Sequence, residues 1–270
     1  MYRIYNLKSS ENVEVSSELG PFTVITHIRN LQAPAGTQPG SLMEAYVSGL
    51  MLQRSHQLIC QLADSGVLVA AGMMQWMVGE CSMVSDANGL LGYLGKQIRG
   101  KMTGQESIAP HYTGNGTVVL EPVEGDIMLV SLKDWQEGLV IEKGLFLAAS
   151  DDVSLSTAAR TNMSSAIFGK EGMFSMVLKG QGFVALQVPC PKETLVLVEL
   201  EDDVLKVDGN FAVAWSQTLD FTVENSGKTV TSSALSKEGF VNTYRGTGKI
   251  LLAPIVSFSS AQSEKTEAEE

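Results

Sequence analysis

The chain has 270 residues, of which 44% are hydrophobic, and it carries a formal net charge of −11 at pH 7. It is therefore long enough to bury a sizeable core and too apolar to be a disordered chain. Its 19 basic residues are scattered among 30 acidic ones, whereas a phosphate backbone requires a basic face. We therefore expect no nucleic-acid partner.

The sequence gives some indication of the cellular compartment. The three cysteines, Cys60, Cys81 and Cys190, stand far apart and predict a reducing environment rather than a disulfide framework. Residues 1–15 lack the apolar core of a signal peptide, and the longest uncharged run, residues 65–79, is too short to span a bilayer. We expect a soluble, cytoplasmic protein.

Residues 1–56 are predicted to form a lead-in that packs on the rest of the chain. Within it, FTVITHI (residues 22–28) is typical of a strand, and LQAPAGTQPGS (residues 31–41) is typical of an exposed loop. The main β-domain is expected over residues 57–256. The acidic residues 257–270 are predicted to form a disordered tail.

A strand–glycine–strand motif occurs three times in the β-domain. Its copies are SGVLVAAGMMQWM, EGLVIEKGLFLAA and DVLKVDGNFAVAW, which turn at Gly72, Gly144 and Gly209. A glycine between two apolar runs suits a turn or bulge that needs a positive φ. The first two glycines are 72 residues apart and the next two are 65 apart, so the first unit carries an insertion.

The inserted connector contains the most distinctive segment, GLLGYLGKQIRGKMTG at residues 89–104. Its apolar residues have near-helical spacing, and all of its charges are positive. The segment is either a crossover helix packed on the β-core or a contact with a membrane surface or a second copy. The candidate interaction patch consists of Leu90, Leu91, Leu94, Lys96, Ile98 and Arg99.

A Gly-x-Gly motif also recurs three times, at steps of 66 residues. The copies YTGNGTVVLEP, LKGQGFVALQV and YRGTGKILLAP begin at Tyr112, Leu178 and Tyr244. We interpret the glycines as a strand-entry turn built three times. Two apolar columns of alternating positions follow, which predicts strands covered on both faces. The columns are Val118, Val184, Ile250 with Leu120, Leu186, Leu252, and between them Val119, Ala185, Leu251.

Together these motifs predict an all-β fold with a pseudo-threefold internal repeat of about 66 residues, β-prism-like or barrel-like, with short helical connectors. The pattern resembles the altered-inheritance-of-mitochondria family, whose bacterial members are mostly catalogued as a domain of unknown function. GMFSMVLKGQGFVALQ and GFVNTYRGTGKILLAP carry the resemblance, which covers nearly the whole chain. It implies a repeat-built all-β fold related in shape to the tryptophan RNA-binding attenuation protein, and it supplies no catalytic residues. Mitochondrial members are implicated in inner-membrane organisation, a role that is not carried over to a sequence without a transit peptide.

Motifs for chemistry are absent from the sequence. The three histidines, His27, His56 and His111, lack the spacing of a metal site, and the Gly-x-Gly pairs lack the context of a phosphate-binding loop. The cysteines have no evident partner histidine, and Cys190, between two prolines, is predicted to be more exposed than the other two. We expect no cofactor, no metal and no enzymatic activity.

Two functions remain open. The first is a scaffold or interaction protein that forms a homo-oligomer and contacts a membrane peripherally. The alternative is a small-ligand or carbohydrate-binding β-domain, for which Trp135 and the column Asn115, Gln181, Thr247 could line a pocket.

Overall fold

The computed structural model describes residues 2–28, 54–84, 109–123, 125–142, 144–159, 174–209, 211–225 and 240–254. In this part of the chain there are fifteen β-strands, two short 3-10 turns and no α-helix. The chain is therefore all-β, as its sequence predicts. The predicted helical connectors, the loop of residues 31–41 and the acidic tail lie outside the described residues.

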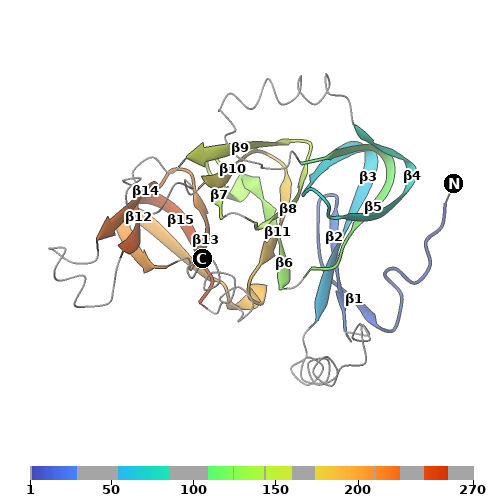
Figure 1. Cartoon of the computed structure of the whole chain (residues 1–270), viewed down its shortest axis with the longest axis horizontal. Helices are drawn as coiled ribbons and strands as arrows, with labels where there is room; N and C mark the ends of the chain where they lie inside the picture. Colours follow the sequence, from blue (N-terminus) through green and yellow to red (C-terminus); the bar gives the residue numbers. More distant parts are fainter. Residues whose placement is uncertain are drawn as a thin grey trace, which may run out of the picture.

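The strands form three groups that lie in a row along the long axis of the molecule (Figure 1). The first group comprises β1 (Val13–Leu19), β2 (Phe22–His27), β3 (Ser55–Val69), β4 (Met74–Val84) and β5 (His111–Leu120). The middle group comprises β6 (Asp126–Ser131), η1 (Leu132–Asp134), β7 (Leu139–Ile141), β8 (Phe146–Ser150), β9 (Val153–Ala159), β10 (Phe174–Gly180) and β11 (Phe183–Val188). The last group comprises η2 (Lys192–Thr194), β12 (Val196–Asp208), β13 (Ala212–Ser216), β14 (Asp220–Asn225) and β15 (Phe240–Leu252).

Two antiparallel sheets run through these groups. The eight-stranded sheet has the order β1-β2-β3-β8-β11-β6, with β5 paired to β3 and β4 paired to β5. The seven-stranded sheet has the order β12-β15-β13-β7-β10-β9, with β14 paired to β15. The pairings β3–β8 and β7–β13 join successive groups, so each group shares a sheet with its neighbour.

The strand–glycine–strand motifs form the predicted turns. Gly72 separates β3 from β4 with a φ of 80°, and Gly144 separates β7 from β8 with a φ of 83°. Two of the three Gly-x-Gly motifs differ from the prediction of a strand-entry turn. The middle copy forms the predicted turn, since Gly180 ends β10 and Gly182 directly precedes β11. Gly114 lies inside β5 and Gly246 inside β15, both with a positive φ. A Cβ on Gly114 would lie 2.2 Å from the Glu80 carbonyl oxygen, so the glycine permits a close approach within a continuous strand.

Three apolar clusters follow one another along the row. Val118, Val184 and Ile250 lie in the first, second and third cluster respectively. The intervening column points to the other face, where Ala185 enters the first cluster and Leu251 packs against the second. The prediction of strands covered on both faces is confirmed for β11 and β15. One face of each strand packs in the apolar cluster of its own group, and the other face packs against the cluster of the preceding group.

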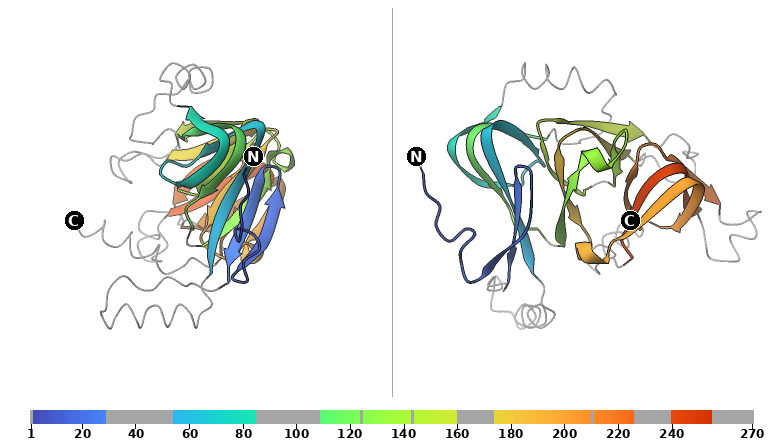
Figure 2. Two further views of the ribbon diagram at one scale, coloured as in Figure 1. Left: turned by 90° about the vertical axis from the view of Figure 1, so that its right-hand side faces the viewer. Right: turned by 180° about the vertical axis from the view of Figure 1, so that it is seen from behind.

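The lead-in belongs to the first sheet. β2 forms where the sequence predicts a strand, and β1, which was not predicted, pairs with it. β2 pairs with β3 along the half that begins at Ser55, and the predicted boundary at residue 56 therefore falls inside β3. Figure 2 shows this group from behind.

The threefold internal repeat stays a prediction, because the middle group has pairs of short strands where β3 and β12 are single long ones.

Candidate functional site

The interaction patch predicted from the sequence lies outside the described residues. This holds for all six of its members, which fall between residues 84 and 109. The remaining candidates are the polar clusters, a hollow and the exposed apolar strands of the described residues.

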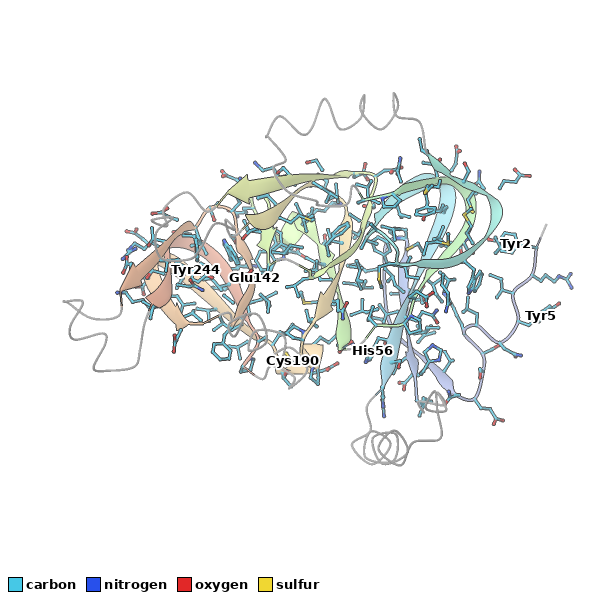
Figure 3. The ribbon with its side chains drawn as sticks, in the orientation of Figure 1. Tyr2, Tyr5, His56, Glu142, Cys190 and Tyr244 are labelled. Carbon is cyan, nitrogen blue, oxygen red and sulfur yellow. The ribbon has the colours of Figure 1, made fainter. Side chains whose placement is uncertain are left out.

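A buried carboxylate, Asp126, gathers polar groups from segments far apart in the sequence. It accepts hydrogen bonds from the backbone N–H of Ile127 at 2.7 Å and of Lys192 at 3.0 Å, and the Lys192 Nζ lies 3.3 Å from both carboxylate oxygens. The His56 Nδ1 lies 3.5 Å from Asp126 Oδ1 and 3.0 Å from Thr26 Oγ1; His56 is marked in Figure 3. Groups of the protein itself surround the carboxylate, so we assign the cluster a structural role.

The environment of His56 predicts a dependence of stability on pH. Burial lowers the pKa of His56, the charges of Lys192 and Arg54 lower it further, and Asp126 opposes them. The unfolded chain, in which a histidine has a pKa of about 6.5, therefore binds more protons than the folded chain just below that pH. Stability from neutral His56 is fully present above about pH 6.5 and is lost as the pH falls toward the folded-state pKa.

Urea unfolding at pH 7.5, 6.5 and 5.5 measures this effect. We expect the free energy of unfolding of the unmodified chain to fall over this range, and to fall less in His56→Gln. An equal fall in both proteins would contradict the assignment to His56.

His111 forms a side-chain hydrogen bond that links the first group to the middle one. Its Nε2 lies 2.6 Å from Oδ1 of Asp151, in the turn between β8 and β9. The backbone at Gly66 lies close to this pair. A Cβ at that position would lie 2.5 Å from the His111 Nε2, so a side chain there would collide with the imidazole. We interpret this pair as a structural link between strands.

The described residues contain no group of three or more His, Cys, Asp or Glu side chains placed to hold a metal ion. None of the described helical turns is long and apolar enough to cross a membrane.

Cys190 does not have the exposure predicted from its flanking prolines, since only 3% of it is exposed and it packs against Val213 and Ala253. Burial also raises the pKa of the Cys60 thiol far above its usual range.

The predicted carbohydrate pocket is not assembled as a whole. Trp135 and Gln181 line a hollow of about 390 Å³ beside η1, but Trp135 is only 7% exposed and packs in the second cluster. Asn115 Oδ1 accepts a hydrogen bond from the backbone of Asp64, and Thr247 Oγ1 accepts one from the backbone of Asp202. The column therefore supports local turns rather than a shared pocket, and Trp135 offers little surface for a sugar to stack on.

Exposed apolar side chains occur on β4 and β12. These two strands lie at opposite ends of the row (Figures 1 and 2). On β4, Met77 is 40% and Met83 47% exposed; on β12, Val196 is 46%, Leu197 51% and Val204 44% exposed. In the described part of the chain β4 pairs only with β5, and β12 pairs only with β15. Among the described residues each strand therefore has one unpaired edge, and a free apolar edge is a template for adding another strand. We take these two edges as the candidate interaction site.

Sequence reasoning missed these edges. β12 begins within LVLVEL, an apolar run of the kind that usually forms a buried strand. Val196 and Leu197 are exposed, and no described strand pairs with the outer edge of β12. The identity of a strand's neighbours is not recorded in its own sequence.

Comparisons with known proteins agree with this fold. A model of the family described as mitochondrial biogenesis AIM24 matches residues 51–255. The crystal structure of a Streptococcus pyogenes protein is 21% identical, with a TM-score of 0.55, and the match covers 80% of this chain and 94% of that one. At this identity the likeness shows the fold alone. No curated protein matches the chain.

Proposed function

We propose that this chain, which belongs to the mitochondrial biogenesis AIM24 family, is a non-enzymatic interaction protein that associates with itself and contacts a membrane peripherally. The exposed apolar side chains on the free edges of β4 and β12 carry the proposal. A free edge presents unpaired backbone N–H and C=O groups, and an added strand satisfies them while it buries apolar surface.

The polar groups support a role without catalysis. Asp126 is held by Lys192 and a backbone N–H, and His111 is paired with Asp151. A catalytic group needs access to a substrate, whereas these side chains bridge strands within the fold.

The membrane contact rests on the sequence patch and on one exposed aromatic. Leu90, Leu91, Leu94 and Ile98 supply apolar surface, and Lys96 and Arg99 supply attraction to anionic lipid. Tyr5 is 74% exposed at the end of the molecule that carries β4 (Figure 3). Tyrosine is enriched where a protein meets the membrane–water interface.

Sedimentation velocity over a concentration series, together with co-sedimentation on vesicles of phosphatidylcholine and phosphatidylserine, tests both parts. We expect a discrete oligomer and vesicle binding that weakens with salt. The double variant Leu91→Glu with Leu94→Glu is expected to lose vesicle binding, while Glu121→Gln serves as a surface control that retains it. A monomer at every concentration would refute self-association, and unchanged vesicle binding in the double variant would refute the role of the patch.

A further inference from the structure

Residues 2–8 form a strap across the first group, with contacts to β2 at one end and to β4 and β5 at the other. The strap contains no strand. In the described part of the chain, no backbone-to-backbone hydrogen bond joins it to another segment. It is therefore attached through its side chains. Figure 3 marks two of them, Tyr2 and Tyr5.

Tyr2 attaches the strap to β4 and β5. Its hydroxyl lies 2.9 Å from the Thr117 Oγ1. The Thr117 hydroxyl donates its own proton to the Gln61 Oε1 at 3.1 Å, so Tyr2 is the donor in its bond with Thr117. The ring lies against Gly79 of β4, where a Cβ would come within 2.9 Å of the ring carbon Cε1. The glycine therefore leaves room for the aromatic ring.

Leu7 and Lys8 attach the other end. Leu7 packs, together with Val13 and Trp76, on a small buried cluster that consists of Ile25, Ile59 and Val119. The Lys8 Nζ donates to the Thr23 Oγ1 of β2 at 3.0 Å and lies 3.2 Å from the Glu18 Oε1. Tyr5, by contrast, is 74% exposed, and it is the natural control position on the same segment.

The face under the strap corresponds to a packing face in the other two groups. Val119 belongs to the same apolar column as Ala185 and Leu251. Ala185 enters the first cluster, and Leu251 packs against the second, so each of these residues packs on the preceding group. The first group begins the row, and Leu7 of the strap helps to cover Val119 instead.

The attachments of the strap are individually weak. They are one neutral hydrogen bond, one ion pair between exposed side chains and one partly buried leucine. Each of the polar contacts contributes little net stability in water, so the strap can be displaced while the sheets stay folded. In proteins built from stacked units, an uncovered end face accepts further stacking, and a capping element prevents it.

We propose that residues 2–8 are a displaceable cap, latched by Tyr2 on Gly79 and Thr117, which keeps a second copy of the chain from packing on the face around Val119. Displacement of the strap uncovers a face of the kind by which the groups pack on one another. The inference adds a control element to the self-association proposed above, and it does not use the edges of β4 and β12.

Trypsin cleavage after Lys8, followed by mass spectrometry of the intact chain, tests the latch, because a protease cleaves a segment that has lifted from the fold. The double variant Tyr2→Ala with Leu7→Ala is expected to be cleaved at least about tenfold faster than the unmodified chain. Tyr2→Phe removes only the hydrogen bond and should be cleaved about fivefold faster. Tyr5→Ala is the matched control and should be cleaved at the unmodified rate. Unchanged cleavage in the first two variants would overturn the latch.

Sedimentation velocity of the same proteins at equal concentrations tests the capping. We expect the double variant to form larger assemblies that dissociate on dilution, and Tyr5→Ala to behave like the unmodified chain. Faster cleavage without larger assemblies, or an aggregate that does not dissociate on dilution, would overturn the capping and leave the proposed self-association intact. An unmodified chain that stays monomeric, while the double variant associates reversibly, would refute that self-association and support the cap.

Discussion

Replacing Trp215 with alanine is expected to lower the free energy of unfolding by about 3–5 kcal/mol. Trp215 is 3% exposed at the centre of the third cluster. Its ring centroid lies 5.3 Å from that of Tyr244 and 5.7 Å from that of Phe221. The substitution removes both ring contacts and leaves a cavity that β13 and β15 cannot close without moving.

Chemical denaturation followed by far-ultraviolet circular dichroism measures this loss, since the signal does not depend on the removed indole. Val204→Ala is the control, because Val204 is 44% exposed on β12 of the same group and should cost about 1 kcal/mol or less. A loss in Trp215→Ala no larger than that of the control would mean that the third cluster does not hold the last group together.

Replacing Asp126 with alanine is expected to lower the free energy of unfolding by about 3 kcal/mol. The substitution leaves the backbone N–H groups of Ile127 and Lys192 without their acceptor. It also removes the buried one of the two carboxylates that pair with the Lys192 ammonium. The effect should exceed that of losing a surface ion pair, because the Asp126 side chain is only 7% exposed.

Glu193→Ala provides the matched control for this variant. Glu193 also pairs with the Lys192 Nζ, at 3.6 Å, but its side chain is 71% exposed. Pairs of this kind contribute about 0–1 kcal/mol. Equal unfolding free energies for the two variants, measured by urea titration at pH 7.5, would show that Asp126 does not bridge the fold.

Local features of the fold could be predicted from the sequence because their causes are local. The turns at Gly72 and Gly144 follow from glycine between apolar runs. The columns of Val118, Val184 and Ile250 follow from alternation along a strand, and each enters a separate cluster. The strand β2 follows from the composition of residues 22–28.

Other features depend on residues that are distant in the sequence. The close approach of Gly114 to the Glu80 carbonyl cannot be deduced from a Gly-x-Gly motif, so the prediction of a strand-entry turn is wrong for the copies at Gly114 and Gly246, which lie inside β5 and β15. The Asp126 cluster joins β2, β3, β6 and the residues before β12, and no motif marks it. Cys190 is buried by Val213 and Ala253 rather than exposed by its neighbouring prolines.

The candidate site illustrates the same limit. Val196 and Leu197 at the start of β12 are exposed, and no described strand pairs with the outer edge there. Leu58 and Ile59 near the start of β3 are buried, and β2 pairs with them. An apolar strand sequence is compatible with both situations. Only the pairing of strands distinguishes a core strand from an interaction edge.

Native mass spectrometry of the protein, purified gently from its own source, tests most directly whether the chain acts through self-association. The account predicts a discrete oligomer whose mass is a multiple of that of the chain, with no additional bound molecule. A monomer carrying a small molecule of defined mass would contradict it, and the identity of that molecule would indicate a binding site instead of an interaction edge.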